Sequence, residues 1–479
     1  MIADWAQYSH LLYNIIGVVY AIMVLTVIGV VLGENRNPVK SMAWVLVLVL
    51  LPVIGLIVYL VFGRSLKGTR LISGSSLRDL RRLYDFPRVE GLEDGLSDDS
   101  RQLISLVNKL SSGHLFGGNA IDVFTTGREK FEALKRDIEA AREYVLVQYF
   151  IIENDEVGSE LIKLLERKAR EGVKVTVLYD YVGSYHFSSR VLREMRAAGI
   201  DVHPFLEVTL ANMAFRINWR NHRKLVVIDG EVGYVGGMNI ANRYVTGDSK
   251  GAAWRDTHLR VKGMAVAVFQ LSFAIDWNFT TREMLKIEPK RHDVDCGGYM
   301  MQMMASGPTS RWHNISLVFL RAITLAKRQV YIQTPYFLPS DALLKALQST
   351  ALSGVDVKLM IPRHPDSTML RLATGSYIKE CILSGIKVYF YEPEMMHAKV
   401  LIVDDEFVTT GSTNFDFRSF EHNFEFNALI YDKEFNRKMK DIFEADLERC
   451  TRVSLGKWKQ RPVLQKALES VVRLISPIL

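Results

Sequence analysis

The chain has 479 residues, enough for two or three domains that each bury a core. Its three scattered cysteines have neither the spacing of a zinc site nor the density of a disulfide framework, which excludes a disulfide-stapled secreted domain and fits a reducing compartment. Hydrophobic residues make up 48%, and the formal charge of +7 leaves two classes of partner, nucleic acid or an anionic membrane surface.

Two uncharged apolar runs predict a transmembrane hairpin over residues 1–63. The spans cover about residues 11–33 and 43–63, and each is long enough for a bilayer core of about 30 Å. The tail before the first span has no Lys or Arg, unlike the basic start of a cleaved signal peptide. The alternative is a buried helix pair in a soluble protein.

Basic residues follow the hairpin in residues 64–110, which we interpret as a juxtamembrane linker. Because Lys and Arg are enriched in cytoplasmic loops, this bias favours a cytoplasmic location for the chain that follows the hairpin. Basic clusters beside a span are also attracted to anionic headgroups, which favours a membrane over nucleic acid as the partner. The bases nearest the second span are Arg64, Lys67, Arg70, Arg78, Arg81 and Arg82.

The rest of the chain reads as an internal duplication, with a first half over residues 111–285 and a second over 286–450. In each half, strands rich in Val, Ile, Leu and Tyr alternate with helical patterns, which is typical of a layered α/β domain. Gln148 of the first half aligns with Gln333 of the second. Residues 451–479 predict a C-terminal amphipathic helix, whose apolar stripe either packs on the core or contacts the membrane.

Each half contains one copy of the motif H-x-K-x4-D-x6-G-(G/S)-x-N, after its third predicted strand. The copies are NHRKLVVIDGEVGYVGGMN and MHAKVLIVDDEFVTTGSTN. Six constrained positions match by chance on the order of 10⁻⁷ per site, so we interpret the copies as two halves of one catalytic site rather than as two core histidines. The motif residues are His222, Lys224, Asp229, Gly236, Gly237 and Asn239 in the first half, and His397, Lys399, Asp404, Gly411, Ser412 and Asn414 in the second.

These residues resemble the phospholipase D superfamily, whose hallmark is a pair of His-Lys-Asp motifs. The N-terminal hairpin and the blocks WRDTHLRV, TPYFLP and GSTNFDFRSFEHNFEFN are similar in order and spacing to those of bacterial cardiolipin synthases. The resemblance implies two pseudo-symmetric phospholipase D-like α/β/α halves that share one active site. It also implies a multi-pass protein of the bacterial cytoplasmic membrane that acts on phosphatidylglycerol, and it is compatible with a homodimer.

Two histidines suit the exchange of one alcohol for another on a phosphodiester. One attacks phosphorus to give a phosphohistidine, and the other protonates the leaving glycerol and then activates the incoming hydroxyl. By analogy with the superfamily, His222 is the nucleophile and His397 the acid–base. No metal or other cofactor is expected, since the groups around the phosphoryl oxygens would be Lys224, Lys399, Asn239 and Asn414.

Four carboxylates are assigned to supporting roles. Asp256 and Glu425 occupy equivalent positions in the repeat, and the family places such an acid beside each His, where it fixes the tautomer. Asp229 and Asp404 belong to the motif set, and we interpret them as structural residues that hold the turn after the motif strand.

An insertion of 11 residues precedes the first motif, around residues 210–220. We expect it to form a rim or a substrate-facing loop, with Arg216 and Arg220 as contacts for anionic headgroups; a merely solvated rim is the alternative. The predicted function is cardiolipin synthesis from two phosphatidylglycerol molecules. A hydrolytic phospholipase D, in which water resolves the intermediate, and a membrane-attached nucleic-acid phosphodiesterase are the alternatives, and nucleic acid is not the expected partner.

Overall fold

The computed structural model describes the chain from residue 2, except residues 34–37, 52, 65, 85–90, 112, 210–215, 248–250, 286, 289, 291–295 and 477–479. Contacts divide it into two units. The first comprises Met1–Ser65 with Val208–Asn218, and the second Leu66–Glu207 with Trp219–Leu479. The central part of the insertion predicted to form a rim, residues 210–215, therefore lies outside the described residues.

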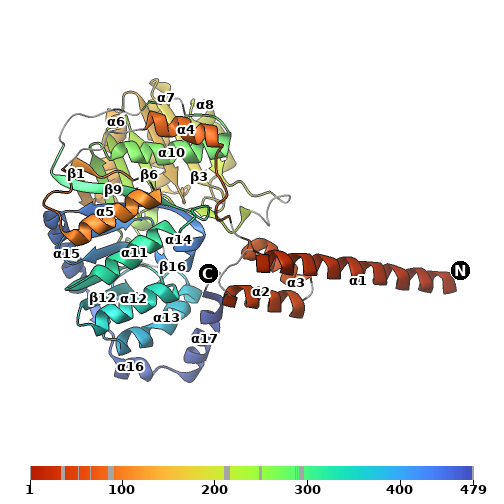
Figure 1. Cartoon of the computed structure of the whole chain (residues 1–479). Coiled ribbons are helices and arrows are strands. Elements are labelled where there is room, and N and C mark those ends of the chain that lie inside the picture. The colour runs from red at the N-terminus through yellow and green to blue at the C-terminus, as the bar shows by residue number, and fades with distance from the viewer. Residues whose placement is uncertain are drawn as a thin grey trace. The chain divides into compact units, whose positions relative to one another are not determined.

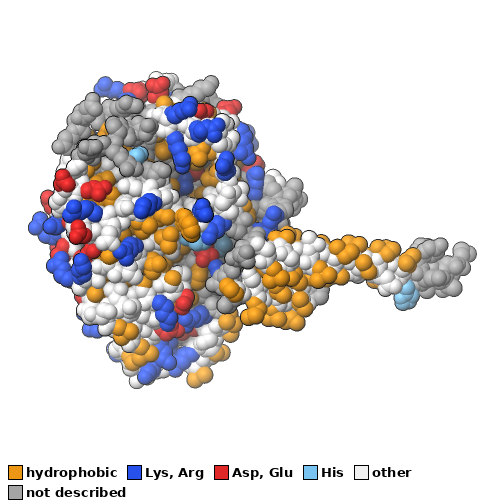
Figure 2. All heavy atoms as spheres, in the orientation of Figure 1, with side chains coloured by type: hydrophobic (Ala, Val, Ile, Leu, Met, Phe, Trp, Pro, Cys, Tyr) orange, Lys and Arg blue, Asp and Glu red, His pale blue; other side chains and the backbone are white. Residues whose placement is uncertain are grey.

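The first unit is a set of apolar helices: α1 (Ile2–Gly33), α2 (Pro38–Leu50), α3 (Ile54–Val58) and a π-helical turn, η1 (Tyr59–Gly63). A small core forms around Val31, Leu48 and Tyr59. Large hydrophobic side chains cover the outside of these helices (Figure 2). In the described part of the chain, one helical segment, His10–Gly33, has the length and composition to cross a membrane.

The second predicted span, over residues 43–63, is not one continuous helix. α2 ends before Pro52 and α3 begins after it. Proline lacks the N–H that a helix interior needs and clashes with the preceding turn, which the hydropathy pattern alone does not show. Beside this break, the backbone N–H of Val53 donates to the Tyr20 hydroxyl at 3.0 Å, so a polar group that lipid could not satisfy has a partner.

The second unit is built on one sheet of 16 strands (Figure 1). The first half supplies β1 (Phe116–Phe124), β2 (Tyr144–Tyr149), β3 (Lys174–Asp180), β4 (Asp201–Phe205), β5 (Arg220–Asn221), β6 (Leu225–Ile228), β7 (Val232–Gly236) and β8 (His258–Lys262). The second half supplies β9 (Tyr299–Ser306), β10 (Gln329–Gln333), β12 (Asp356–Pro362), β13 (Lys387–Tyr391), β14 (Val400–Val403), β15 (Phe407–Gly411), β17 (Asn423–Tyr431) and β18 (Cys450–Arg452).

The strand order repeats about the centre of the sheet. The first half runs β4-β3-β2-β6-β7-β8 and the second β13-β12-β10-β14-β15-β17. β1 and β9 pair antiparallel where the halves meet, and β9 pairs with β17. In each half, three parallel strands are followed by the antiparallel motif strand, β6 or β14. This confirms the predicted order of strand, helix, strand, helix, strand and motif.

Helices cover both faces of the sheet. Those of the first half are α6 (Gly127–Ala140), α7 (Glu156–Arg170), α8 (Ser189–Ala197) and α10 (Val266–Thr281). Those of the second are α11 (Asn314–Leu325), α12 (Asp341–Leu352), α13 (Thr368–Leu383) and α15 (Lys433–Leu447), followed by α16 (Leu455–Lys459) and α17 (Val463–Ile475). Fully buried Val, Ile and Leu side chains of the parallel strands fill the space beneath them, as expected for strands covered on both faces.

The stretch expected to be a juxtamembrane linker is part of the globular unit. It contains α4 (Gly74–Leu83) and α5 (Asp98–Ser111). Leu80 joins the core that runs through both halves, while Ile104 and Val107 of α5 join the core of the second half. Apolar residues one turn apart form a helical stripe that must be buried. The expectation of a linker was therefore wrong for these helices, because their apolar stripes pack into the cores of the second unit.

Candidate active site

Strand pairing between the halves brings His222 to an acid of the second half. β5 pairs in parallel with the start of β17, and the backbone N–H of His222 donates to the Phe424 carbonyl at 2.9 Å. The His222 Nδ1 then lies 3.0 and 3.1 Å from the two carboxylate oxygens of Glu425. Both side chains are buried.

The second histidine makes the reciprocal contact with the first half. A parallel bridge joins Met396 to Arg255, and the His397 N–H donates to the Arg255 carbonyl at 2.7 Å. The His397 Nδ1 lies 2.6 Å from Oδ2 of Asp256, which is fully buried. Each histidine thus takes its carboxylate from the other half. Neither half alone supplies both a motif histidine and the acid that it contacts.

Burial is the main influence on both imidazoles. It lowers the pKa of His222 to about 4, with Glu425 opposing and Lys224 assisting the shift. It also lowers the pKa of His397 to about 4, here with Lys399 as the next cause and Asp256 opposing. A carboxylate at Nδ1 selects the tautomer that carries its proton there. Both rings are then neutral near pH 7, and each has a free lone pair on Nε2.

The two lysines differ in what they contact. The Nζ of Lys224 donates to the His222 carbonyl at 2.7 Å, and burial lowers the pKa of Lys224 well below its usual value. The Nζ of Lys399 donates to the His397 carbonyl and lies 2.8 Å from the His397 Nδ1, while burial lowers the pKa of Lys399 to about 8. Since the Asp256 carboxylate accepts the Nδ1 proton, Lys399 acts on that ring as a positive charge rather than as a donor.

Both asparagines are buried, and the side chain of each is already engaged, that of Asn414 with the Asp416 carboxylate. The Asn239 Nδ2 donates to the Tyr244 hydroxyl at 3.0 Å, and its Oδ1 accepts from the Ile151 N–H at 3.3 Å. The backbone N–H of Asn414 donates to the Ser419 hydroxyl at 3.2 Å. Tyr244 also lies 3.4 Å from the His397 Nδ1. Asn239 therefore contacts the His397 side of the site through Tyr244.

The difference between Gly237 and Ser412 has a steric cause. The Ser412 hydroxyl donates to Glu425 and accepts from the Phe426 N–H at 2.9 Å. At the equivalent place in the first half, a Cβ on Gly237 would lie 2.2 Å from the Asp256 Oδ1. Aspartate is one methylene shorter than glutamate, so its carboxylate occupies the space that the serine hydroxyl fills in the second half.

The motif aspartates hold strand ends. Asp229 accepts three backbone N–H groups at 2.8 Å, from residues 142–144 at the start of β2. Asp404 accepts those of residues 327–329 at 2.8 to 3.0 Å. Both adopt a positive φ, of 51° and 47°, directly after their motif strands. These contacts fit the structural role that we inferred from the sequence.

The structure corrects the role expected for Arg220. This side chain is buried rather than on a rim, because β5 pairs with β17 and is part of the sheet. The Nη1 of Arg220 lies 3.2 Å from the Asp180 carboxylate. A buried arginine paired with a carboxylate cannot meet a headgroup at the surface. Arg216 is half-buried and groups with the first unit.

Residues that the sequence analysis did not single out surround the motif residues. The rings of Phe150 and His222 lie 4.9 Å apart, and those of Trp254 and His397 5.4 Å apart. Asp276 and Asp446 form a second repeated pair. Each accepts from the glutamine aligned in the repeat, at 2.6 Å from Gln148 and 2.8 Å from Gln333. Each also pairs with an arginine beside the site, Asp276 with Arg223 and Asp446 with Arg255. The alignment of Gln148 with Gln333 was the signal that could have revealed them.

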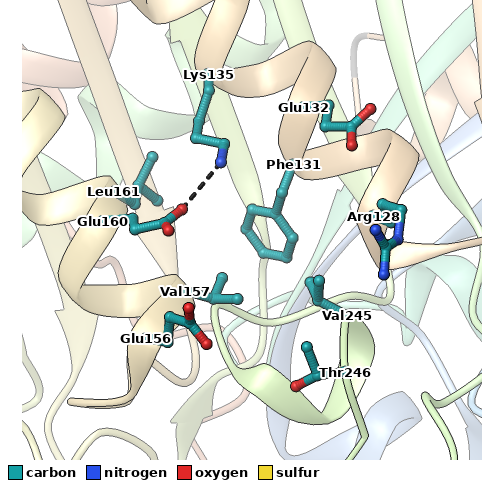
Figure 3. A pocket seen from close by; sticks show the side chains of 10 residues that line it. All are labelled: Arg128, Phe131, Glu132, Lys135, Glu156, Val157, Glu160, Leu161, Val245 and Thr246. Atoms are coloured by element: carbon teal, nitrogen blue, oxygen red, sulfur yellow. Dashed lines mark hydrogen bonds and ion pairs between the residues drawn. The ribbon is translucent and has the colours of Figure 1, made fainter.

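A surface cavity of about 230 Å³ lies between α6 and α7 (Figure 3). Its charged side chains have both signs, and Lys135 pairs with Glu160 across it at 2.9 Å. None of the ten residues that line it belongs to either motif. This cavity is distinct from the histidine site. In the part of the chain that the structure describes, no group of three His, Cys, Asp or Glu could hold a metal ion.

The paired halves and the crossed histidine–carboxylate contacts define the phospholipase D class of fold and site. The chain matches a family described as cardiolipin synthase, phospholipase D-like domain, over residues 134–252 and 319–447. It also matches a phospholipase D-nuclease N-terminal family over residues 18–64.

Relatives narrow the assignment. A cardiolipin synthase of Listeria monocytogenes is 38% identical over 96% of this chain and 99% of its own. The major cardiolipin synthase of Bacillus subtilis is 39% identical over 96% of this chain and 98% of its own length. The chain belongs to the bacterial cardiolipin synthase family, and it is a phosphatidyltransferase associated with a membrane, as predicted. The structure is similar to the crystal structure of a phosphatidylserine synthase from Haemophilus influenzae, with a TM-score of 0.62 and 14% sequence identity. The match covers 80% of this chain and all of that chain, which shows a shared fold.

Proposed function

We propose that the enzyme makes cardiolipin and glycerol from two phosphatidylglycerol molecules through a phosphohistidine. The Nε2 of His222 attacks phosphorus, and the P–O bond to the headgroup glycerol breaks as His397 supplies a proton to the leaving oxygen. A headgroup hydroxyl of the second lipid then gives its proton to His397 and attacks the phosphohistidine. The P–N bond breaks and His222 is regenerated, so one diester is lost and one is formed. The crossed pairing carries this proposal, because it gives both rings a free Nε2.

The unequal surroundings of the rings support this division of roles. At His222 the Lys224 Nζ donates to the backbone carbonyl, so the charged group at Nδ1 is the Glu425 carboxylate, which makes Nε2 a better nucleophile. At His397 the Lys399 Nζ lies 2.8 Å from Nδ1, and its positive charge makes the protonated ring a stronger acid. A phosphodiester anion between the rings would favour the proton that His397 must carry before the first step.

Lys224 and Lys399 are proposed to stabilise charge on the phosphoryl oxygens. Both are buried, so their ammonium groups are poorly solvated in the free enzyme. An anionic phosphate beside them would restore favourable interactions, and these would strengthen as charge develops in the transition state. Asn414 is proposed as a further donor.

The membrane arrangement follows from the hairpin and the bases after it. We propose that α1 crosses the bilayer, that the second apolar segment returns through it with its break at Pro52, and that the globular unit lies on the cytoplasmic side. Nucleic acid is not proposed as a substrate, and a homodimer stays a prediction. Cysteine labelling from either side of sealed vesicles tests the topology. In vesicles that keep the orientation of the cell membrane, modification of the exposed Cys296 only by a reagent on the outside would contradict the cytoplasmic placement.

The reaction is tested with purified full-length enzyme and phosphatidylglycerol as the only lipid. Equal amounts of cardiolipin and glycerol are expected. His222→Ala should lower the rate on the order of 10⁴-fold or more, as loss of a nucleophile does. His203→Ala, at a half-exposed histidine paired with Asp201, is the matched control and should retain activity. Phosphatidic acid and glycerol as the only products would show hydrolysis and contradict the synthase reaction.

A further inference from the structure

The C-terminal helix α17 turns its apolar face outward. Leu464, Leu468 and Leu474 are 71%, 45% and 81% exposed, and Val463 and Val471 are exposed as well. A surface helix of a soluble protein normally buries its apolar stripe and shows polar residues to water. Five large apolar side chains on one exposed face are a signature of an interaction surface.

The opposite, polar face of α17 is fastened to α13, beside which it lies (Figure 1). Glu469 is 4% exposed, and its Oε1 would lie 2.9 Å from a Cβ on Gly375 of α13. Arg461 pairs with Glu469 at 2.5 Å, and Arg473 pairs with Glu380 of α13 at 2.5 Å. The packing on α13 therefore fixes the orientation of the helix and leaves the apolar face exposed.

A positively charged cavity of about 650 Å³ opens between α13, α16 and α17. Five cationic side chains line it; Arg461 and Arg473 are paired with Glu469 and Glu380, so the excess positive charge comes from the three lysines. Leu474 of the apolar face also belongs to the lining, so cationic and apolar surfaces adjoin. The cationic lining residues are Lys379, Lys459, Arg461, Lys466 and Arg473.

We propose that α17 is an interfacial helix that enters the surface of an anionic phospholipid bilayer, with the adjoining cavity binding the phosphate of a lipid headgroup. An apolar stripe beside cationic side chains is complementary to acyl chains beneath phosphates. The inference rests on the membrane anchor proposed above, which would keep the bilayer near. This attachment is separate from the histidine site, and it would bind the second unit to the membrane in addition to the proposed hairpin anchor.

The test uses full-length His222→Ala protein, which cannot turn lipid over, in nanodiscs. The exposed thiol is removed by Cys296→Ser, and an environment-sensitive fluorophore is attached to Leu468→Cys or Leu474→Cys. Leu352→Cys, at an equally exposed leucine of α12, is the control. In nanodiscs with equal amounts of phosphatidylcholine and phosphatidylglycerol, nitroxide-bearing lipids should quench the α17 labels at least about twofold more than in phosphatidylcholine alone. The label at 352 should be unaffected in both.

The cavity is tested by Lys379→Gln and Lys459→Gln, with Lys345→Gln on α12 as the control. Each cavity variant should lower the ratio of membrane-docked to free α17 about fivefold in the anionic nanodiscs, and the control should not change it. Absence of quenching at α17 would overturn the proposal. If the fluorescence also shifted to the blue, the apolar face would be covered by protein; without such a shift it would face water. Equal quenching with and without phosphatidylglycerol would overturn the headgroup site. None of these readouts depends on catalysis, so failure here is distinguishable from failure of the proposed reaction.

Discussion

Gly237→Ser would place in the first half the serine that the second half has at Ser412. A Cβ at 237 would lie 2.2 Å from the Asp256 Oδ1, whereas real Cβ contacts begin near 3.0 Å. The carboxylate must withdraw by about 1 Å, a misplacement of the size that lowers rates about 10²-fold. The 2.6 Å contact between Asp256 and the His397 Nδ1 would then be lost. The loss corresponds to about 2.7 kcal/mol of transition-state stabilisation.

The assay is the initial rate of cardiolipin formation in detergent–lipid micelles, with a melting curve to confirm that the variant is folded. If the clash acts through the carboxylate, Asp256→Ala should lower the rate about as much as Gly237→Ser does. Adding Gly237→Ser to the Asp256→Ala variant should then lower the rate no further. Ser412→Gly, the reciprocal change, removes one donor to Glu425 without a clash and should lower the rate about tenfold. Wild-type activity in Gly237→Ser, or an equal loss with and without the Asp256 side chain, would refute the steric explanation.

Two further predictions concern stability. Asp229→Asn should lower the free energy of unfolding by about 1–3 kcal/mol, because one acceptor oxygen for the backbone N–H groups at the start of β2 is lost. The kcat of the folded enzyme should stay within about twofold of the wild-type value. A large loss of kcat at an unchanged melting temperature would contradict this structural role. The pKa of each buried histidine is near 4 when folded against 6.5 in the free side chain, so the unfolded chain binds more protons between these values and stability falls as pH drops from about 6.5 to 4. The melting temperature should follow that slope, and His397→Asn should make it shallower; an unchanged slope would contradict the assignment.

The repeat and the motifs could be predicted from sequence because they are local patterns. The motif strands β6 and β14 and the parallel strands before them follow from short runs of Val, Ile and Leu. The pairing of each histidine with the acid of the other half could not be predicted, because it depends on contacts between residues about 200 positions apart, such as His222 and Glu425. The charge-dense segment around Arg220 suggested a rim that contacts anionic headgroups. The short pairing of β5 with β17 places that side chain inside instead.

Two other differences have equally specific causes. The second apolar run has the length of a span, but its helix is not continuous, since α2 ends at Leu50 and α3 begins at Ile54; hydrophobic composition does not reveal that break. The basic residues of 64–110 suggested a juxtamembrane linker. Ile104 and Val107, however, lie on one helical face and are buried in the globular unit. For α17 the amphipathic pattern was visible, but only the packing on α13 shows which face points outward.

The central claim is that two histidines from opposite halves divide one phosphoryl transfer between them. It is tested with a phosphatidyl ester of p-nitrophenol, a leaving group that needs no proton. His397→Ala should release a burst of p-nitrophenolate equal to the enzyme concentration and accumulate a phosphatidyl adduct on His222, because no base remains to activate the acceptor. His222→Ala should give no burst and no adduct. A burst and an adduct in His222→Ala, with none in His397→Ala, would contradict the assignment.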